Sequence, residues 1–310
     1  MIKMRKNKSM KRSYFHFATW RLSLASVLCA LVMHSAWSAQ PLLSRPLELA
    51  GAPNTRPALL QYDDPYADFR AARHSNAGLL TEREEIRLGM QLHREVTRRF
   101  NLTDAGLDRV ERIGQRVAKA SRRPNLIYKF HVIQSREING FSLPGGHVYV
   151  TTALLKLANE NELAAVLAHE VGHIVARHSL KTLKQSQDYD AIAAALGSIT
   201  GVAGDTARDL GVALGQIVGE GFLAVHTRDE EREADFLGVR TMARAGFDPQ
   251  GMITMFQKLQ RIGAEDSSLL GTLFSDHPDA QERIENTRYE IARMKGRRYS
   301  GQEGRLAAAR

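Results

Sequence analysis

The stretch that decides the fold is His169-Glu170-Val171-Gly172-His173, an H-E-x-x-H sequence. Residues four apart on an α-helix share one face, so His169 and His173 can hold one zinc ion together while Glu170 reaches a water molecule beside it. This spacing is typical of zinc peptidases, in which the glutamate takes the proton of the attacking water. The pentapeptide also occurs by chance, so its surroundings decide what it means.

The flanking residues predict that the motif lies on an amphipathic helix. Asn161 is the expected N-cap, and Glu162 lies in the first turn. Apolar residues then recur at spacings of three and four, namely Leu163, Val166, Leu167, Val171, Ile174 and Val175. A core helix that merely carries two hydrogen-bonded histidines is the alternative interpretation.

A second amphipathic helix after Thr227 offers the third ligand that a catalytic zinc ion needs. Glu230, Glu231 and Glu233 compete for this role. Glu231 forms an i, i+4 pair with Asp235 beside the apolar face, whereas Glu233 is expected to point well away from Glu231. We therefore predict Glu231 as the ligand and Asp235 as the carboxylate that receives the other N–H of a ligating histidine. A solvated, charged helix face is the alternative.

With these residues in place, the chain resembles the M48 family of zinc metallopeptidases, which combine H-E-x-x-H with a later E-x-x-x-D, here Glu231 to Asp235. The segment 139–150 resembles the family's N-A-F-x-x-P-G-G hairpin, with Gly140 where alanine is common. His277-Pro278 followed by Glu282-Arg283-Ile284 resembles the H-P…E-R-I segment of periplasmic members that act in outer-membrane assembly. The resemblance covers residues 81–294.

This resemblance implies an α+β, zincin-like metallopeptidase fold, mostly helical, with a small sheet or hairpin beside the active-site helix. It also implies one zinc ion (Zn2+) per chain. In the resembling proteases the histidine equivalent to His277 occupies the fourth position of the zinc and silences the enzyme, or assists at the oxyanion. A surface histidine before a helix-starting proline is the third interpretation.

The hairpin predicts a platform for substrate, formed by the strand that contains Asn139, Gly140 and Phe141. An edge strand can pair with an extended peptide through main-chain hydrogen bonds, which do not depend on the peptide's sequence. We therefore expect unfolded or extended polypeptides as substrates. An ordinary structural hairpin is the alternative.

Residues 1–39 predict a secretory signal peptide. They contain seven lysine and arginine residues and no acidic residue, followed by an apolar core at 22–33 and small residues up to Ala39. A core of about twelve residues is shorter than the roughly twenty that span a bilayer, which disfavours a permanent anchor. We expect export to the periplasm, with cleavage after Ser38 or Ala39.

The positive charge of the chain resides mostly in this leader. The sequence has 43 basic and 34 acidic residues, and removal of the leader's seven basic residues leaves 36 against 34. A nearly neutral mature chain excludes nucleic-acid binding, which needs a basic patch. Cys29, the only cysteine, lies in the apolar core of the leader, so an oxidising compartment would not affect the mature protein.

Residues 40–77 predict an extended or disordered arm, and residues 78–310 one M48-type peptidase domain without a tetratricopeptide domain. Within that domain we expect helices from a Thr81/Glu84 capping box to Phe100 and over 103–121, and helices opening at Asp248-Pro249 and Pro278. The Ala- and Gly-rich segment 191–225 is not a membrane span. It is expected to be core packing or a lid, with contact to a membrane surface as the less favoured alternative.

Together these features predict an exported zinc endopeptidase. By resemblance, its substrates would be misfolded or stalled envelope proteins and its partner the outer-membrane assembly machinery. The alternative from another class is a chaperone-like or scaffold protein with a structural, four-coordinate zinc ion, because structural zinc sites are closed.

Overall fold

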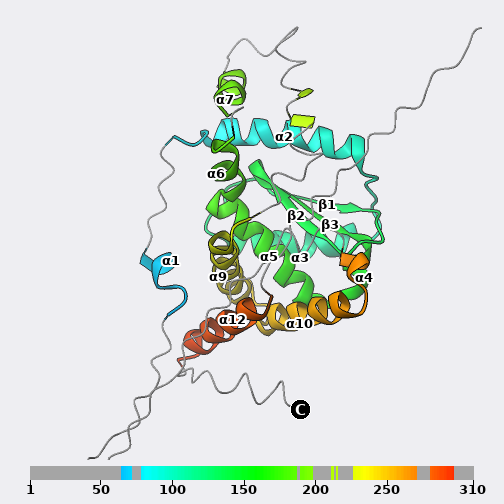
Figure 1. Ribbon diagram of the computed structural model, residues 1–310, viewed down its shortest axis with the longest axis vertical. Coiled ribbons are helices and arrows are strands. Elements are labelled where there is room, and N and C mark those ends of the chain that lie inside the picture. The colour runs from blue at the N-terminus through cyan, green and yellow to red at the C-terminus, as the bar shows by residue number, and fades with distance from the viewer. Residues whose placement is uncertain are drawn as a thin grey trace, which may run out of the picture. The chain divides into compact units, whose positions relative to one another are not determined.

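The computed structural model describes residues 64–71, 78–186, 189–197, 211–212, 214–215, 226–270 and 280–296. The helices are α1 (Ala67–Ala71), α2 (Glu82–Arg99), α3 (Leu107–Ala120), α4 (Thr152–Leu157), α5 (Glu160–Ala176), α6 (His178–Lys184), α7 (Tyr189–Gly197), α9 (Arg228–Arg244), α10 (Gln250–Glu265) and α12 (Ala280–Met294). The strands are β1 (Lys129–Ile133), β2 (Gly140–Leu143) and β3 (His147–Thr151), and the short 3-10 turns are η1 (Pro144–Gly146) and η2 (Ser267–Leu270). The predicted α+β class, mostly helical with a small sheet, is confirmed (Figure 1).

The three strands form a mixed sheet in the order β1-β3-β2, in which β1 is parallel and β2 antiparallel to β3. Alternate residues of a strand point to opposite faces, so the sheet has two different sides. Tyr149 lies on the side packed against α2, with Leu88 and Leu92. Val148 and Val150 lie on the other side, in the core shared with α3 and α5. The active-site helix α5 is therefore held against the sheet by apolar burial.

A capping box opens α5, but at a different residue from the predicted one. Asn159 accepts a hydrogen bond from the Glu162 backbone N–H at 3.0 Å, and the Glu162 carboxylate accepts from the Asn159 N–H at 2.8 Å. The predicted N-cap Asn161 is wrong, because reciprocal pairing requires the acid three residues after the cap. Asn161 lies inside the helix, where its side chain accepts from the backbone N–H of Asp248.

Of two further predicted helix starts, the structure confirms one and shifts the other. The capping box of Thr81 and Glu84 is confirmed at the start of α2. The helix expected over 103–121 begins only at Leu107, because Gly106 precedes it with φ of 83°, a left-handed conformation that favours glycine. Thr103 instead donates its backbone N–H to Val132 at the end of the sheet.

Close contact between α5 and α9 brings the two predicted ligand helices together. A Cβ atom on Gly172 would lie 2.8 Å from the carbonyl oxygen of Ala234, so only glycine permits this approach. Gly172 is the fourth residue of the H-E-x-x-H sequence, and Ala234 directly precedes Asp235. The backbones therefore set the distance at which the side chains of the two helices meet.

The two segments of uncertain role are described only in part. Residues 67–71 of the predicted arm form helix α1, so this part is not extended, and the neighbouring Tyr66 packs on Phe236 of α9. In the segment 191–225, Ile192, Leu196 and Leu214 are buried in the core beside α2, as packing predicts. The rest of both segments and the predicted signal peptide (1–39) lie outside the described residues. Within the part of the chain that is described, no helix combines the length and apolarity needed to cross a membrane.

Candidate active site

His169, His173 and Glu231 meet between α5 and α9, and all three are buried. The Nε2 atoms of the two histidines lie 2.9 Å apart. The carboxylate oxygens of Glu231 lie 3.4 Å from Nε2 of His169 and 3.3 Å from Nε2 of His173. Two imidazole nitrogens and a carboxylate thus converge on one point, which is the donor set of catalytic zinc sites.

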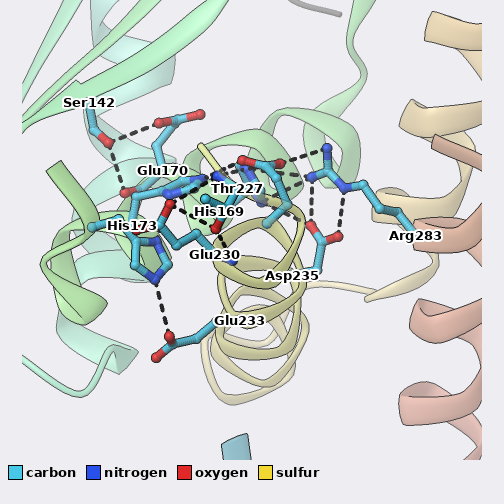
Figure 2. A network of polar contacts seen from close by, with 11 residues as sticks. Ser142, His169, Glu170, His173, Thr227, Glu230, Glu233, Asp235 and Arg283 are labelled. Atoms are coloured by element: carbon cyan, nitrogen blue, oxygen red, sulfur yellow. Dashed lines mark hydrogen bonds and ion pairs between the residues drawn. The ribbon is translucent and has the colours of Figure 1, made fainter. Parts of the chain in front are cut away.

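Asp235 lies one turn further along α9 and contacts the opposite side of His169. Its Oδ1 accepts a hydrogen bond from Nδ1 of His169 at 2.9 Å. The buried guanidinium of Arg283, on α12, donates to both oxygens of Asp235 at 2.7 Å (Figure 2). It also lies 2.8 Å from Glu231. Arg283 therefore neutralises two buried carboxylates and holds α12 against the site, a role that its place in the E-R-I segment alone did not reveal.

A second buried chain of contacts supports His173. Nδ1 of His173 lies 2.8 Å from Nδ1 of His178, and Nε2 of His178 lies 3.1 Å from the carboxylate of Glu233. The alternative of a solvated acidic helix face is wrong for Glu231 and Glu233, because both are buried. The only sequence signal for this arrangement is a third histidine five residues after His173.

The electrostatics of the site favour a positive charge at the convergence point. Burial lowers the pKa of His169, but the Glu231 charge and the Asp235 hydrogen bond outweigh burial and raise this pKa to about 9. The pKa of His173 is lowered by burial and by the neighbouring His226 and His169. The Glu231 carboxylate faces both Nε2 atoms and supplies the negative charge that a metal ion held there would need.

Glu170 is buried on the side of α5 that faces the sheet. Its Oε2 accepts a hydrogen bond from the Ser142 hydroxyl at 2.9 Å, and the same hydroxyl lies 3.2 Å from the Glu170 carbonyl oxygen. Ser142 belongs to β2, the strand that contains the predicted substrate residues Gly140 and Phe141. Asn139 directly precedes this strand and donates its backbone N–H to Thr151. The strand and the proposed base are thus joined directly, a contact that the sequence did not indicate. His277 lies outside the described residues.

A helix carrying H-E-x-x-H beside a small sheet, with a glutamate contributed by a second helix, defines a zincin-like metallopeptidase. The family comparison agrees, because residues 106–291 match Peptidase family M48. The chain belongs to this family of metallopeptidases.

The curated relatives are proteases of several origins. The chain is 30% identical to the beta-barrel assembly-enhancing protease of Escherichia coli (strain K12) over 191 residues, 60% of this chain and 39% of that protein. It is 31% identical to the metalloprotease YcaL of the same organism, over 53% of this chain and 62% of YcaL. It is also 31% identical to the mitochondrial metalloendopeptidase OMA1 of Schizosaccharomyces pombe, over 56% of this chain and 50% of OMA1. The match therefore spans less than two thirds of each of these relatives.

Proposed function

We propose that this chain is an exported zinc endopeptidase that cleaves misfolded or stalled envelope proteins. His169, His173 and Glu231 would hold the zinc ion, and Glu170 would act as general base. The observation that carries the proposal is the convergence of two Nε2 atoms and one carboxylate next to a second, independently held glutamate. Membership of a metallopeptidase family supports the same chemistry.

In this mechanism Glu170 takes the proton of the attacking water and passes it to the leaving amine. When bound, zinc supplies a Lewis acid that polarises the scissile carbonyl and shifts the pKa of water at the site toward 7. The Ser142 hydroxyl donates to Oε2 of Glu170, which fixes the orientation of this carboxylate. Asp235 and the His178–Glu233 pair orient the two histidines.

The edge strand β2 is the proposed platform for the substrate backbone. Among the strands that the structure describes, β2 pairs only with β3, so its opposite edge can receive an extended peptide. A peptide paired with β2 would run beside Ser142, whose hydroxyl contacts Glu170. Main-chain pairing with β2 would select an extended backbone. This supports the proposal that substrates are recognised as unfolded segments and not by their amino-acid sequence.

The cellular setting is proposed from the leader and from the relatives. The basic and apolar residues of 1–39 support export to the periplasm. One relative is named a beta-barrel assembly-enhancing protease, which supports outer-membrane assembly machinery as a partner. His277 is proposed as a fourth ligand or oxyanion donor on the family resemblance alone.

Metal analysis of the full chain combined with casein digestion tests this proposal. The wild-type chain should bind zinc and digest casein, and a chelator should abolish digestion. Glu170→Gln should keep its zinc but lose turnover, because glutamine has the shape of glutamate and cannot accept the proton. Glu160→Gln, which changes an exposed acid in the first turn of the same helix, is the matched control and should behave as wild type. Zinc binding without any digestion would instead support the chaperone-like alternative, and wild-type turnover of Glu170→Gln would contradict the mechanism.

A further inference from the structure

Three histidines that the proposed peptidase chemistry does not use gather on the side of the sheet that faces α2. They are His93 on α2, His131 on β1 and His147 on β3. In the parallel register, His147 pairs with Lys129 and Tyr149 pairs with His131. His131, His147 and Tyr149 therefore share one face of the sheet, because residues two apart on a strand point the same way. None of them belongs to the group formed by His169, His173 and Glu231.

The nitrogen atoms of this cluster are close enough to share one ion. Nε2 of His131 lies 3.1 Å from Nδ1 of His147. Two imidazoles on one tetrahedral ion, each about 2.0–2.1 Å from the metal, have nitrogens roughly 3.3 Å apart. One nitrogen of each of the three rings lies within 4.8 Å of the others, so the three rings together offer three nitrogen donors to one ion.

Tyr149 fixes the third ring. Its hydroxyl lies 2.7 Å from Nδ1 of His93, which leaves Nε2 as the ring nitrogen available for a metal. A hydrogen bond to the far nitrogen of a metal-binding histidine is the usual device that sets its tautomer and orientation. The His93 ring stacks on His131 and His147 with centroids 4.6 and 4.7 Å away, so aiming the in-plane lone pair of Nε2 at a shared ion requires this ring to tilt about its contact with Tyr149.

The three rings are neutral near pH 7. Burial, together with His93 and Lys129, lowers the pKa of His131 to about 4. Burial and the same neighbours, with His131 added, lower the pKa of His147 to about 3. Burial, Lys129 and Arg94 lower the pKa of His93. Neutral imidazole is the form that binds metals, and a lowered pKa favours that form.

The donor set also limits the kind of ion. It consists of imidazole nitrogens, and the charged groups that act on it, Lys129 and Arg94, are both cations. Hard ions such as Mg2+ and Ca2+ require carboxylate or carbonyl oxygens, whereas Zn2+, Cu2+ and Ni2+ bind imidazole well.

We propose that His93, His131 and His147 form a second metal site for an imidazole-binding divalent transition ion of the Zn2+ class, separate from the peptidase centre. The ion would join α2 to two strands of the sheet. The strand β3 carries His147 and also pairs with β2, so the ion would stiffen the sheet that forms the proposed substrate platform. A neutral stack of aromatic rings without metal is the competing explanation, because Tyr149 and Phe141 extend the same stack.

Metal counting on matched variants tests the second site. The full chain is saturated with Zn2+, dialysed and analysed for bound zinc. Wild type should retain one more zinc ion than His131→Phe or His147→Phe, which keep an aromatic ring in the stack and remove its nitrogens. Glu231→Gln should lose a different ion, so His131→Phe combined with Glu231→Gln should lose both. Zinc held by residues elsewhere in the chain cancels in these differences.

Thermal unfolding gives a second readout. After the peptidase centre is filled, further Zn2+ should raise the Tm of wild type but not that of His131→Phe, because binding to the folded state stabilises it. If the phenylalanine variants do not fold, His93→Gln at the half-buried helix position serves in their place and should show the same loss. Equal zinc content and equal Tm shifts in wild type and a folded variant would overturn the second site and favour the metal-free stack. They would leave the proposed peptidase centre untouched, since that centre is tested by Glu170→Gln and Glu231→Gln.

Discussion

Asp235 accepts a hydrogen bond from Nδ1 of His169 across 2.9 Å, and this contact directs Nε2 of His169 toward His173. The tautomer of the first histidine is therefore set from the far side of its ring. The carboxylate is itself held by Arg283, so its position does not depend on the histidine. Burial alone would raise the pKa of Asp235, but the charge and hydrogen bonds of Arg283 and the contact with His169 hold this pKa below its usual value.

The first prediction concerns this contact. Asp235→Asn keeps the size of the side chain but removes the charge that stabilises Nδ1–H of His169. We expect zinc affinity or turnover to fall by about 10- to 100-fold, as for other residues that orient metal ligands. Competition with a chromogenic chelator measures the affinity. An affinity equal to that of wild type would show that Asp235 does not position His169.

The second prediction separates the three acids of α9. Glu231→Gln should cause the largest loss of zinc, because Glu231 faces both Nε2 atoms. Glu233→Gln should cause a smaller loss, since Glu233 acts only through His178 on His173. Asp229→Asn changes an exposed acid of the same helix and should have no effect. Zinc content after dialysis ranks the variants, and a greater loss for Glu233→Gln than for Glu231→Gln would exclude Glu231 as the ligand.

The third prediction concerns Arg283. Arg283→Leu removes the cation that faces both Glu231 and Asp235, and leaves two buried carboxylates close together. Breaking a buried ion pair from one side costs about 3–5 kcal/mol of stability. We expect a loss of this size in the free energy of unfolding, measured with urea in the presence of a chelator.

The same unfolding measurement is repeated with zinc present and with a control variant. Zinc should restore part of the lost stability of Arg283→Leu, because a bound cation compensates the same carboxylates. Arg261→Leu, at an exposed position of α10, should unfold like wild type. Equal stability of Arg283→Leu and wild type would refute the proposed role of the guanidinium.

The sequence predicted the parts of the fold and site that depend on short-range spacing. The i, i+4 relation placed His169 and His173 on one face, and the same relation singled out Glu231 beside Asp235. Spacing along the chain does not show how helices pack against each other, so the contacts of Arg283 on α12 were not predicted. Glu233 was expected to point away from Glu231, and it does contact a different group, but it is buried because His178, the first residue of α6, lies against it. The Asn159 cap was missed for a local reason, since two asparagines lie within three residues and only Asn159 has its partner acid at the third position.

The last prediction concerns the pH dependence of stability at the start of the active-site helix. The carboxylate of buried Glu162 lies 2.6 Å from Nζ of Lys258 and accepts from the Asn159 backbone. Burial raises the pKa of Glu162, but these two contacts outweigh burial and lower it below the usual value. The unfolded chain then binds more protons than the folded chain between the two pKa values. The stability that the Glu162 contacts contribute is therefore present above the unfolded pKa and is lost as pH falls through the folded pKa.

Lys258→Met should lower the free energy of unfolding by about 1.5–3 kcal/mol at pH 7, the range for hydrogen bonds to charged groups. The difference in stability between wild type and Lys258→Met should narrow as pH falls through the folded pKa of Glu162, because the carboxylate then loses its charge in both proteins. Urea unfolding at several pH values measures the gap, and Lys119→Met on the exposed side of α3 is the control. A gap that stays constant with pH would show that Lys258 stabilises α5 through packing instead of through the charge of Glu162.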